Sequence, residues 1–130
     1  MAFKKILIID DDPDYVEAVG TLLEAKNYKI DSASNGDDGF HKAVQDKPDL
    51  IILDVMMTRK DEGVNVARKL RGEESTSGIP IILVTGIRKE MRLPFGFEPD
   101  EENLPVKAVL EKPVKPDVLL KTVAESFSKV

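Results

Sequence analysis

Carboxylates stand directly after two short apolar runs of this chain. The acids Asp10–Asp12 follow the run Lys5–Ile9, and Asp54 follows the run Leu50–Leu53. Carboxylates that gather at one place repel one another, and a hard divalent cation such as Mg²⁺, which prefers oxygen ligands, would relieve that repulsion. A carboxylate beside such a cation can also act as a nucleophile and form an aspartyl phosphate. The alternative is that the triplet only caps and precedes a helix begun by Pro13.

A hydroxyl and an ammonium group follow two further apolar runs. Thr85 and the small Gly86 come after Ile79–Val84, and Lys112 comes shortly after Val106–Leu110. Ligands of parallel α/β sheets bind outside the carboxyl ends of the strands. We therefore expect these groups to meet the carboxylates at one edge, where a lysine would neutralise charge on a transferring phosphoryl group and a threonine hydroxyl would donate to it.

Strand and helix patterns alternate along the chain. The apolar runs lack polar alternation, which is typical of parallel strands covered on both faces. Strands are predicted over Lys5–Ile9, Tyr28–Ala33, Asp49–Asp54, Ile79–Val84 and Val106–Leu110. Apolar spacing and start and stop signals predict helices over Pro13–Lys26, from the Ser34–Gly36 turn to Asp46, over Gly63–Arg71 and from Pro116 onward.

This alternation predicts one α/β domain: a doubly wound, flavodoxin-like, five-stranded parallel sheet with helices on both faces. Prolines interrupt the stretch Ile87–Pro105, where a further helix would fall. We expect that helix, the fourth in chain order, to be short or irregular.

Composition narrows the classes of function. The 130 residues fit one domain, and the net charge of −5 disfavours direct binding to nucleic acid. The absence of cysteine excludes disulfides and thiolate metal sites and fits a cytoplasmic protein. No apolar run approaches the ~20 residues that a membrane-spanning helix needs, so we expect no membrane insertion.

The motifs carrying these groups identify a family. The chain resembles the response-regulator receiver domain of two-component signalling (CheY-like) through Ile6–Pro13, Pro48–Asp54, Ile79–Gly86 and Glu111–Pro113. The resemblance spans essentially all of residues 1–130 and implies a single receiver domain with no output domain. It implies a phosphorelay switch, which receives a phosphoryl group from a histidine kinase or a histidine phosphotransfer protein and acts through contacts with a downstream protein. Such a phosphoprotein catalyses its own phosphorylation but is not a turnover enzyme, and homodimer formation is left open.

The resemblance also assigns a role to each site residue. Asp54 would be the phosphoacceptor, and Mg²⁺ would be held by Asp54, Asp11, Asp10 (largely through water) and the backbone carbonyl of Met56. Asp12 would keep its role as a helix cap.

The same resemblance assigns the phosphoryl contacts. Thr85, Gly86 and Lys112 would contact the phosphoryl group, and the Lys112–Pro113 peptide bond would be cis.

Several positions depart from the family pattern. Val109 stands where the family has a switch aromatic, so the signal would leave by another route. The loop Met56–Gly63 has Thr58 in place of the usual proline and is about one residue longer. In the family, the positions of Met56 and Ile87 flank the path of the water that hydrolyses the phosphoryl group. Two apolar side chains there should hinder that water, so we predict a long-lived phosphoryl group.

Two rival functions remain open at this point. One is a phosphorylation-independent binding module on the same fold, which is disfavoured by the complete set of site residues. The other is a Mg²⁺-dependent phosphohydrolase acting on a small molecule, for which the stretch Ile87–Pro105 is the candidate cap over the site.

Overall fold

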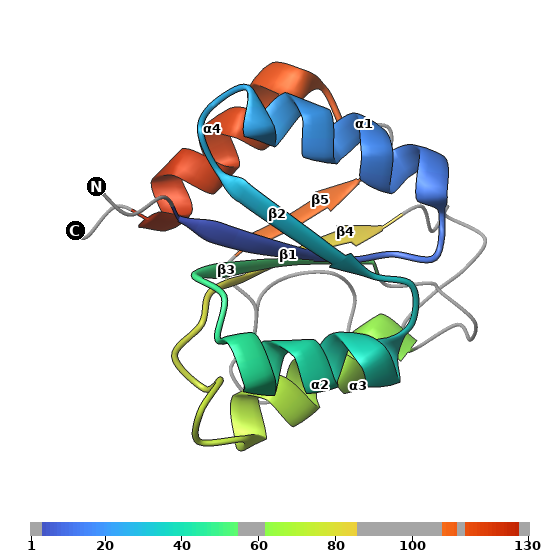
Figure 1. Ribbon diagram of the computed structural model, residues 1–130, viewed down its shortest axis with the longest axis vertical. Coiled ribbons are helices and arrows are strands. Elements are labelled where there is room, and N and C mark those ends of the chain that lie inside the picture. Colours follow the sequence, from blue (N-terminus) through green and yellow to red (C-terminus); the bar gives the residue numbers. More distant parts are fainter. Residues whose placement is uncertain (1–3, 55–61, 86–107, 112–113, 128–130) are drawn as a thin grey trace.

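A single parallel sheet forms the centre of the molecule. The computed structural model describes residues 4–54, 62–85, 108–111 and 114–127. Within these residues the strand order is β2-β1-β3-β4-β5, and every neighbouring pair is parallel (Figure 1). The strands are β1 (Lys5–Ile9), β2 (Lys29–Ala33), β3 (Leu50–Asp54), β4 (Ile81–Thr85) and β5 (Ala108–Glu111). The predicted five-stranded α/β fold is confirmed.

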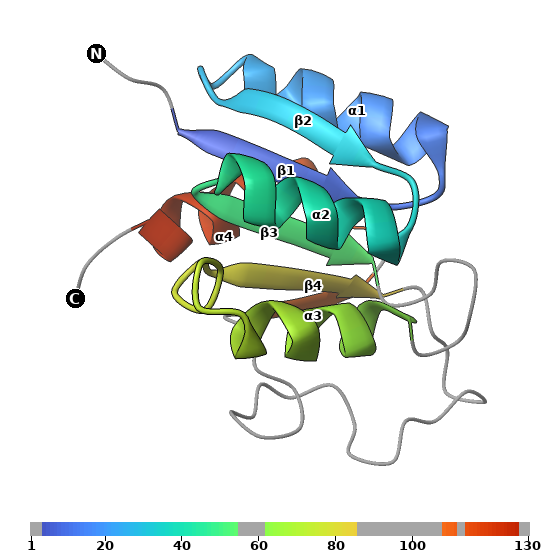
Figure 2. The same cartoon turned by 60° about the horizontal axis from the view of Figure 1, so that its bottom comes forward.

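Helices cover both faces of this sheet. The helices α1 (Pro13–Glu24) and α4 (Pro116–Phe127) lie on one face, and α2 (Gly36–Asp46) and α3 (Glu62–Gly72) lie on the other (Figure 1). Figure 2 shows α2 and α3 side by side, with the strand arrowheads at one common edge. The helix predicted between Ile87 and Pro105 falls outside the described residues. None of the described helices has the length and apolar character that a membrane span requires.

Alternate residues of each strand supply the two halves of the core, because side chains alternate between the faces of a sheet. On the α1 and α4 side, the buried residues are Ile6, Ile8, Val19, Leu23, Leu50, Ile52, Ile82, Val84, Leu119 and Val123. On the α2 and α3 side, they are Leu7, Ile9, Ala33, Ala43, Ile51, Leu53, Val66, Ala67, Leu70, Ile81 and Leu83. Strands β1, β3 and β4 are therefore apolar on both faces, as their uninterrupted apolar runs predicted.

Most element boundaries differ from the sequence prediction by one or two residues, and two of the differences have a clear cause. Helix α1 ends at Glu24 rather than Lys26, because Asn27 takes a left-handed conformation with φ of 69°. Strand β4 begins at Ile81 rather than Ile79. The residue before it, Pro80, has no N–H group, and its carbonyl accepts a hydrogen bond from the Ile51 N–H at 3.0 Å.

The loop between α3 and β4 contains one buried polar side chain. Thr76 is 1% exposed, and its hydroxyl donates to the Leu70 carbonyl oxygen at 2.6 Å. This hydrogen bond satisfies a carbonyl near the C-terminal end of α3, where helices leave backbone acceptors unpaired.

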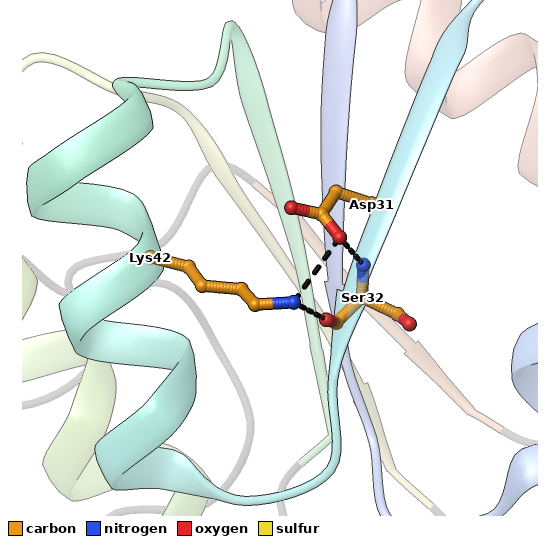
Figure 3. A network of polar contacts seen from close by, with 3 residues as sticks. All are labelled: Asp31, Ser32 and Lys42. Atoms are coloured by element: carbon orange, nitrogen blue, oxygen red, sulfur yellow. Dashed lines mark hydrogen bonds and ion pairs between the residues drawn. The ribbon is translucent and has the colours of Figure 1, made fainter.

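Helix α2 is held closely against the strands that lead to the acidic edge. A Cβ atom on Gly39 would lie 2.5 to 2.8 Å from three side-chain atoms of Ile9, so only glycine fits at this crossing. Figure 3 shows Lys42 of α2 reaching the edge strand β2. Its Nζ donates to the Ser32 carbonyl oxygen at 2.6 Å and to Asp31 Oδ1 at 3.2 Å, which fixes the position of α2 over β2.

Candidate functional site

Strand register places Asp10 and Asp54 side by side. Ile9 of β1 pairs with Leu53 of β3, and each aspartate comes one residue after its member of that pair. The Asp10 N–H donates to the Ala33 carbonyl oxygen at 3.0 Å, which extends the contact between β1 and β2 beyond the last paired residues. The two carboxylates therefore come from adjacent strands at the carboxyl edge of the sheet, where ligands bind in open α/β folds.

Asp11 joins this pair to form a cluster of three carboxylates. One oxygen from each of Asp10, Asp11 and Asp54 can be chosen so that all three lie within 4.8 Å of one another. Asp10 and Asp54 are 3% and 5% exposed, whereas Asp11 is exposed. Mg²⁺ takes carboxylate oxygens as ligands and keeps several of its waters, so a site with two buried acids and one solvent-facing acid fits that ion.

Asp12 has a different role from the other acids of the triplet. Its Oδ1 accepts hydrogen bonds from the N–H groups of Asp14 at 3.0 Å and Tyr15 at 3.4 Å, which makes it the N-cap of α1. Its own N–H donates to Asp10 Oδ1 at 2.9 Å. The predicted capping role of Asp12 is confirmed, and the cap is hydrogen-bonded to a carboxylate of the acidic cluster.

The threonine predicted for the site lies at the same edge of the sheet. Asp54 pairs with Val84 in the β3–β4 register, and Thr85 is the next residue and the last of β4. Thr85 in turn pairs with Glu111, the last residue of β5, which immediately precedes Lys112 in the sequence. The remaining predicted site residues, Met56, Gly86, Lys112 and Pro113, lie outside the described residues.

Tyr15 is a residue of this site that the sequence analysis did not single out. Its side chain is half-buried and packs against the core between the sheet and α1. Burial, and then the negative charges of Asp10 and Asp54, raise the pKa of Tyr15 to about 12. Tyr15, Val19 and Leu23 follow one another at intervals of four residues, and this helical spacing is the signal that places Tyr15 on the buried face of α1.

An open groove adjoins the acidic cluster. Its volume is about 660 Å³, and it lies between α1 and α2 across the end of β2. The lining residues are Asp10, Asp11, Pro13, Val16, Glu17, Ser32, Ala33, Ser34, Asp38, His41, Lys42 and Gln45. The cluster can therefore be approached from solvent on the side of Asp11.

Comparison with known proteins matches nearly the whole chain to one protein family. The family model described as "Response regulator receiver domain" matches residues 6–124. Protein PilH of Pseudomonas aeruginosa is 34% identical over 119 residues, which cover 92% of this chain and 93% of that protein. The alkaline phosphatase synthesis transcriptional regulatory protein PhoP of Bacillus subtilis is 35% identical over 121 residues, but the match covers only 49% of its length.

Solved structures show the same similarity. A CheY-like response regulator receiver domain protein from Methanospirillum hungatei has a TM-score of 0.78 and 25% identity, covering 95% of this chain and 93% of that one. The chemotaxis protein CheY4 of Vibrio cholerae has a TM-score of 0.80 and 25% identity, covering 97% of this chain and all of that one. The fold and the matched length therefore agree with the sequence resemblance.

Proposed function

Because this chain belongs to the response-regulator receiver domain family, we propose that it is a phosphoacceptor switch of a two-component system in which Asp54 receives the phosphoryl group. Receiver domains are signalling switches rather than turnover enzymes. The observation that supports the proposal most directly is the burial of Asp54 within a cluster that includes Asp10 and Asp11, at the carboxyl edge of the sheet.

In the proposed reaction, a carboxylate oxygen of Asp54 attacks the phosphorus of a phosphohistidine on a partner kinase or phosphotransfer protein. The new bond joins that oxygen to phosphorus, the phosphorus–nitrogen bond breaks, and the electron pair of the broken bond returns to the imidazole. No redox partner is needed. Burial of Asp54 keeps its oxygens in one orientation, which lowers the entropic cost of reaching the attacking geometry.

The carboxylates of Asp10 and Asp11 would hold Mg²⁺ together with Asp54. When bound, the cation neutralises charge that builds on the transferring group. The hydrogen bond from the Asp12 N–H to Asp10 Oδ1 holds the Asp10 carboxylate in one orientation, which would leave its second oxygen available to the cation. From the sequence, we propose that the Met56 carbonyl adds a ligand.

We further propose that Thr85, Gly86 and Lys112 contact the phosphoryl group. The position of Thr85 at the end of β4, one residue beyond the partner of Asp54, supports this assignment. For Lys112, the support is its place directly after the last residue of β5. The cis Lys112–Pro113 bond stays a prediction from the resemblance, and a cytoplasmic location stays a prediction from the cysteine-free sequence.

Phosphorylation by acetyl phosphate tests the proposal without the partner kinase. We expect intact-mass spectrometry to show one phosphoryl adduct on the wild type in MgCl₂, and none in EDTA. Asp54→Asn should lose the adduct. Asp46→Asn is the matched control, because it removes an exposed aspartate at the opposite end of α2 and should keep the adduct.

Three other outcomes would contradict the proposal or one part of it. Absence of any adduct on the wild type contradicts phosphoacceptor activity and supports a phosphorylation-independent binding module. Consumption of acetyl phosphate without an adduct supports a phosphohydrolase. Decay of the adduct within seconds in Mg²⁺ would contradict the long phosphoryl lifetime predicted from Met56 and Ile87.

A further inference from the structure

Strand β2 forms one edge of the sheet within the described part of the chain. The backbone groups of successive residues point alternately to the two sides of a strand. The Ala33 carbonyl oxygen accepts from the Asp10 N–H at 3.0 Å, so the backbone groups of Ala33 point toward β1. Ser32 and Ile30, one and three residues before Ala33, therefore direct their N–H and C=O groups outward from the sheet.

Two side chains occupy both outward backbone groups of Ser32. Its N–H donates to Asp31 Oδ1 at 2.8 Å, and its carbonyl oxygen accepts from Lys42 Nζ at 2.6 Å (Figure 3). The same Asp31 oxygen also accepts from Lys42 Nζ at 3.2 Å. The aspartate and the lysine thus hold each other in place over the Ser32 backbone.

This arrangement affects what the edge of the sheet can bind. An edge strand normally presents a row of unpaired N–H and C=O groups, which pair readily with a strand of another molecule. A ladder in either direction extends over several residues, and β2 has only Ile30 and Ser32 facing outward. We propose that Lys42 and Asp31 close the outer edge of β2 to pairing with a strand from a second copy of this chain, by occupying the backbone groups of Ser32.

The close packing of α2 brings Lys42 to this edge. Gly39, three residues earlier, lies on the same side of the helix as Lys42. A Cβ atom on Gly39 would lie within 2.5 to 2.8 Å of Ile9 side-chain atoms, so the glycine lets α2 approach the sheet more closely than another residue would. An incoming strand would have to displace the lysine and the aspartate together and remove both charges from water, which is costly.

The exposure of the pair separates this role from folding stability. The Lys42 and Asp31 side chains are 41% and 55% exposed. Ion pairs this exposed contribute little to the free energy of unfolding, because water screens them. Removal of the two side chains should therefore leave the fold almost unchanged while it uncovers the Ser32 backbone. The inference concerns the edge of the sheet and does not depend on phosphorylation of Asp54.

Sedimentation velocity over a range of protein concentrations tests the inference on the double variant Asp31→Ala with Lys42→Met. Methionine keeps the apolar stem of lysine without the ammonium group, and the loss of one charge of each sign leaves the net charge unchanged. We expect the double variant to self-associate at least about tenfold more tightly than the wild type, because two further backbone hydrogen bonds per copy become available.

Two further variants show whether the association uses this edge. Ser32→Pro, added to the double variant, removes the outward N–H and should return self-association to the wild-type level, and an edge strand tolerates proline where the N–H faces outward. The double variant Asp117→Ala with Lys121→Met is the matched control, because it removes one exposed acid and one exposed lysine from α4. It should associate as the wild type does.

The inference is overturned if Asp31→Ala with Lys42→Met associates no more tightly than the wild type. Tighter association that Ser32→Pro leaves in place, or that the α4 control shows equally, also overturns it, since another surface would then be responsible. Amide hydrogen exchange of Ser32, followed by NMR in the same double variant, is a second measurement and should slow as the protein concentration rises. An exchange rate that is independent of concentration contradicts pairing at β2, even if the Ser32→Pro variant fails to fold.

Discussion

We expect Asp54→Asn to raise the free energy of unfolding when no divalent cation is present. Asp10 and Asp54 are both buried, and with Asp11 they offer oxygens within 4.8 Å of one another. In a cation-free solution these like charges repel, and the repulsion is released when the chain unfolds. Replacement of Asp54 by the neutral, nearly isosteric asparagine removes its repulsion with both neighbours.

The structure sets the size of this effect. Coulomb's law with an effective dielectric constant of about 20 gives about 3.5 kcal/mol of repulsion for two unit charges at 4.8 Å. Asp54 also interacts with groups outside this pair, and asparagine retains those interactions only in part. The exposed Asp11 contributes little because water screens it. We therefore expect a net gain of about 1–2 kcal/mol, because those losses offset part of the repulsion.

Urea denaturation followed by circular dichroism measures this difference. The wild type, Asp54→Asn and the control Asp46→Asn are compared in EDTA and in excess MgCl₂ at low ionic strength. In EDTA, Asp54→Asn should unfold at higher urea than the wild type, whereas Asp46→Asn should stay within about 0.5 kcal/mol. In MgCl₂ the wild type should gain stability by mass action and Asp54→Asn should gain much less, because it lacks one ligand.

The reasoning would be refuted by an Asp54→Asn variant that is no more stable than the wild type in EDTA. It would equally be refuted if MgCl₂ stabilised the wild type, Asp54→Asn and Asp46→Asn to the same extent. The first result would mean that repulsion within the cluster is already offset by other groups, and the second that Mg²⁺ does not bind through Asp54.

Two further predictions follow from the packing around the site. Gly39→Ala should lower the free energy of unfolding, measured by urea denaturation, by about 1–2 kcal/mol. The new Cβ would overlap Ile9, and the cost of that overlap exceeds the free energy gained from the higher helix propensity of alanine. Between pH 10 and about pH 12, the wild type should lose stability more steeply than Tyr15→Phe, because Tyr15 keeps its proton to about pH 12 only in the folded state. Thermal unfolding across that range measures the difference in slope.

Matched variants control both predictions. Gly20→Ala makes the same substitution within α1, where the nearest atom, Ile30 Cγ2, lies at 3.6 Å, an ordinary contact. It should be neutral or stabilising, so a loss equal to that of Gly39→Ala would contradict the steric argument. Tyr28→Phe removes the other tyrosine, and an equally shallow alkaline slope in that variant would contradict the assignment to Tyr15.

Local patterns predicted most of the fold. Uninterrupted apolar runs marked β1, β3 and β4, and apolar spacing marked α3, whose Val66, Ala67 and Leu70 are buried. These patterns work because the periods of strands and helices decide which side chains leave water. The differences lie where a single contact sets a boundary, as at the left-handed Asn27 after α1.

The candidate site was predictable only in part. Parallel strands end at a common edge, so the acids after β1 and β3 could be expected together. Pro13 indicated that Asp12 caps a helix, and the hydrogen bonds to Asp14 and Tyr15 agree. No local pattern predicted that the charges of Asp10 and Asp54 raise the pKa of a tyrosine of α1, because that effect depends on how α1 packs on the sheet.

By itself, then, the sequence determined which strands form, where they end in acids, and which family the chain resembles, since each of these is written in neighbouring residues. The tertiary structure alone decided that Asp10 and Asp54 are buried while Asp11 faces solvent, and that Tyr15 packs against the core between the sheet and α1. The reason is that burial and proximity at this edge depend on the register of β1 against β3 and on the packing of α1, which bring together residues some forty positions apart.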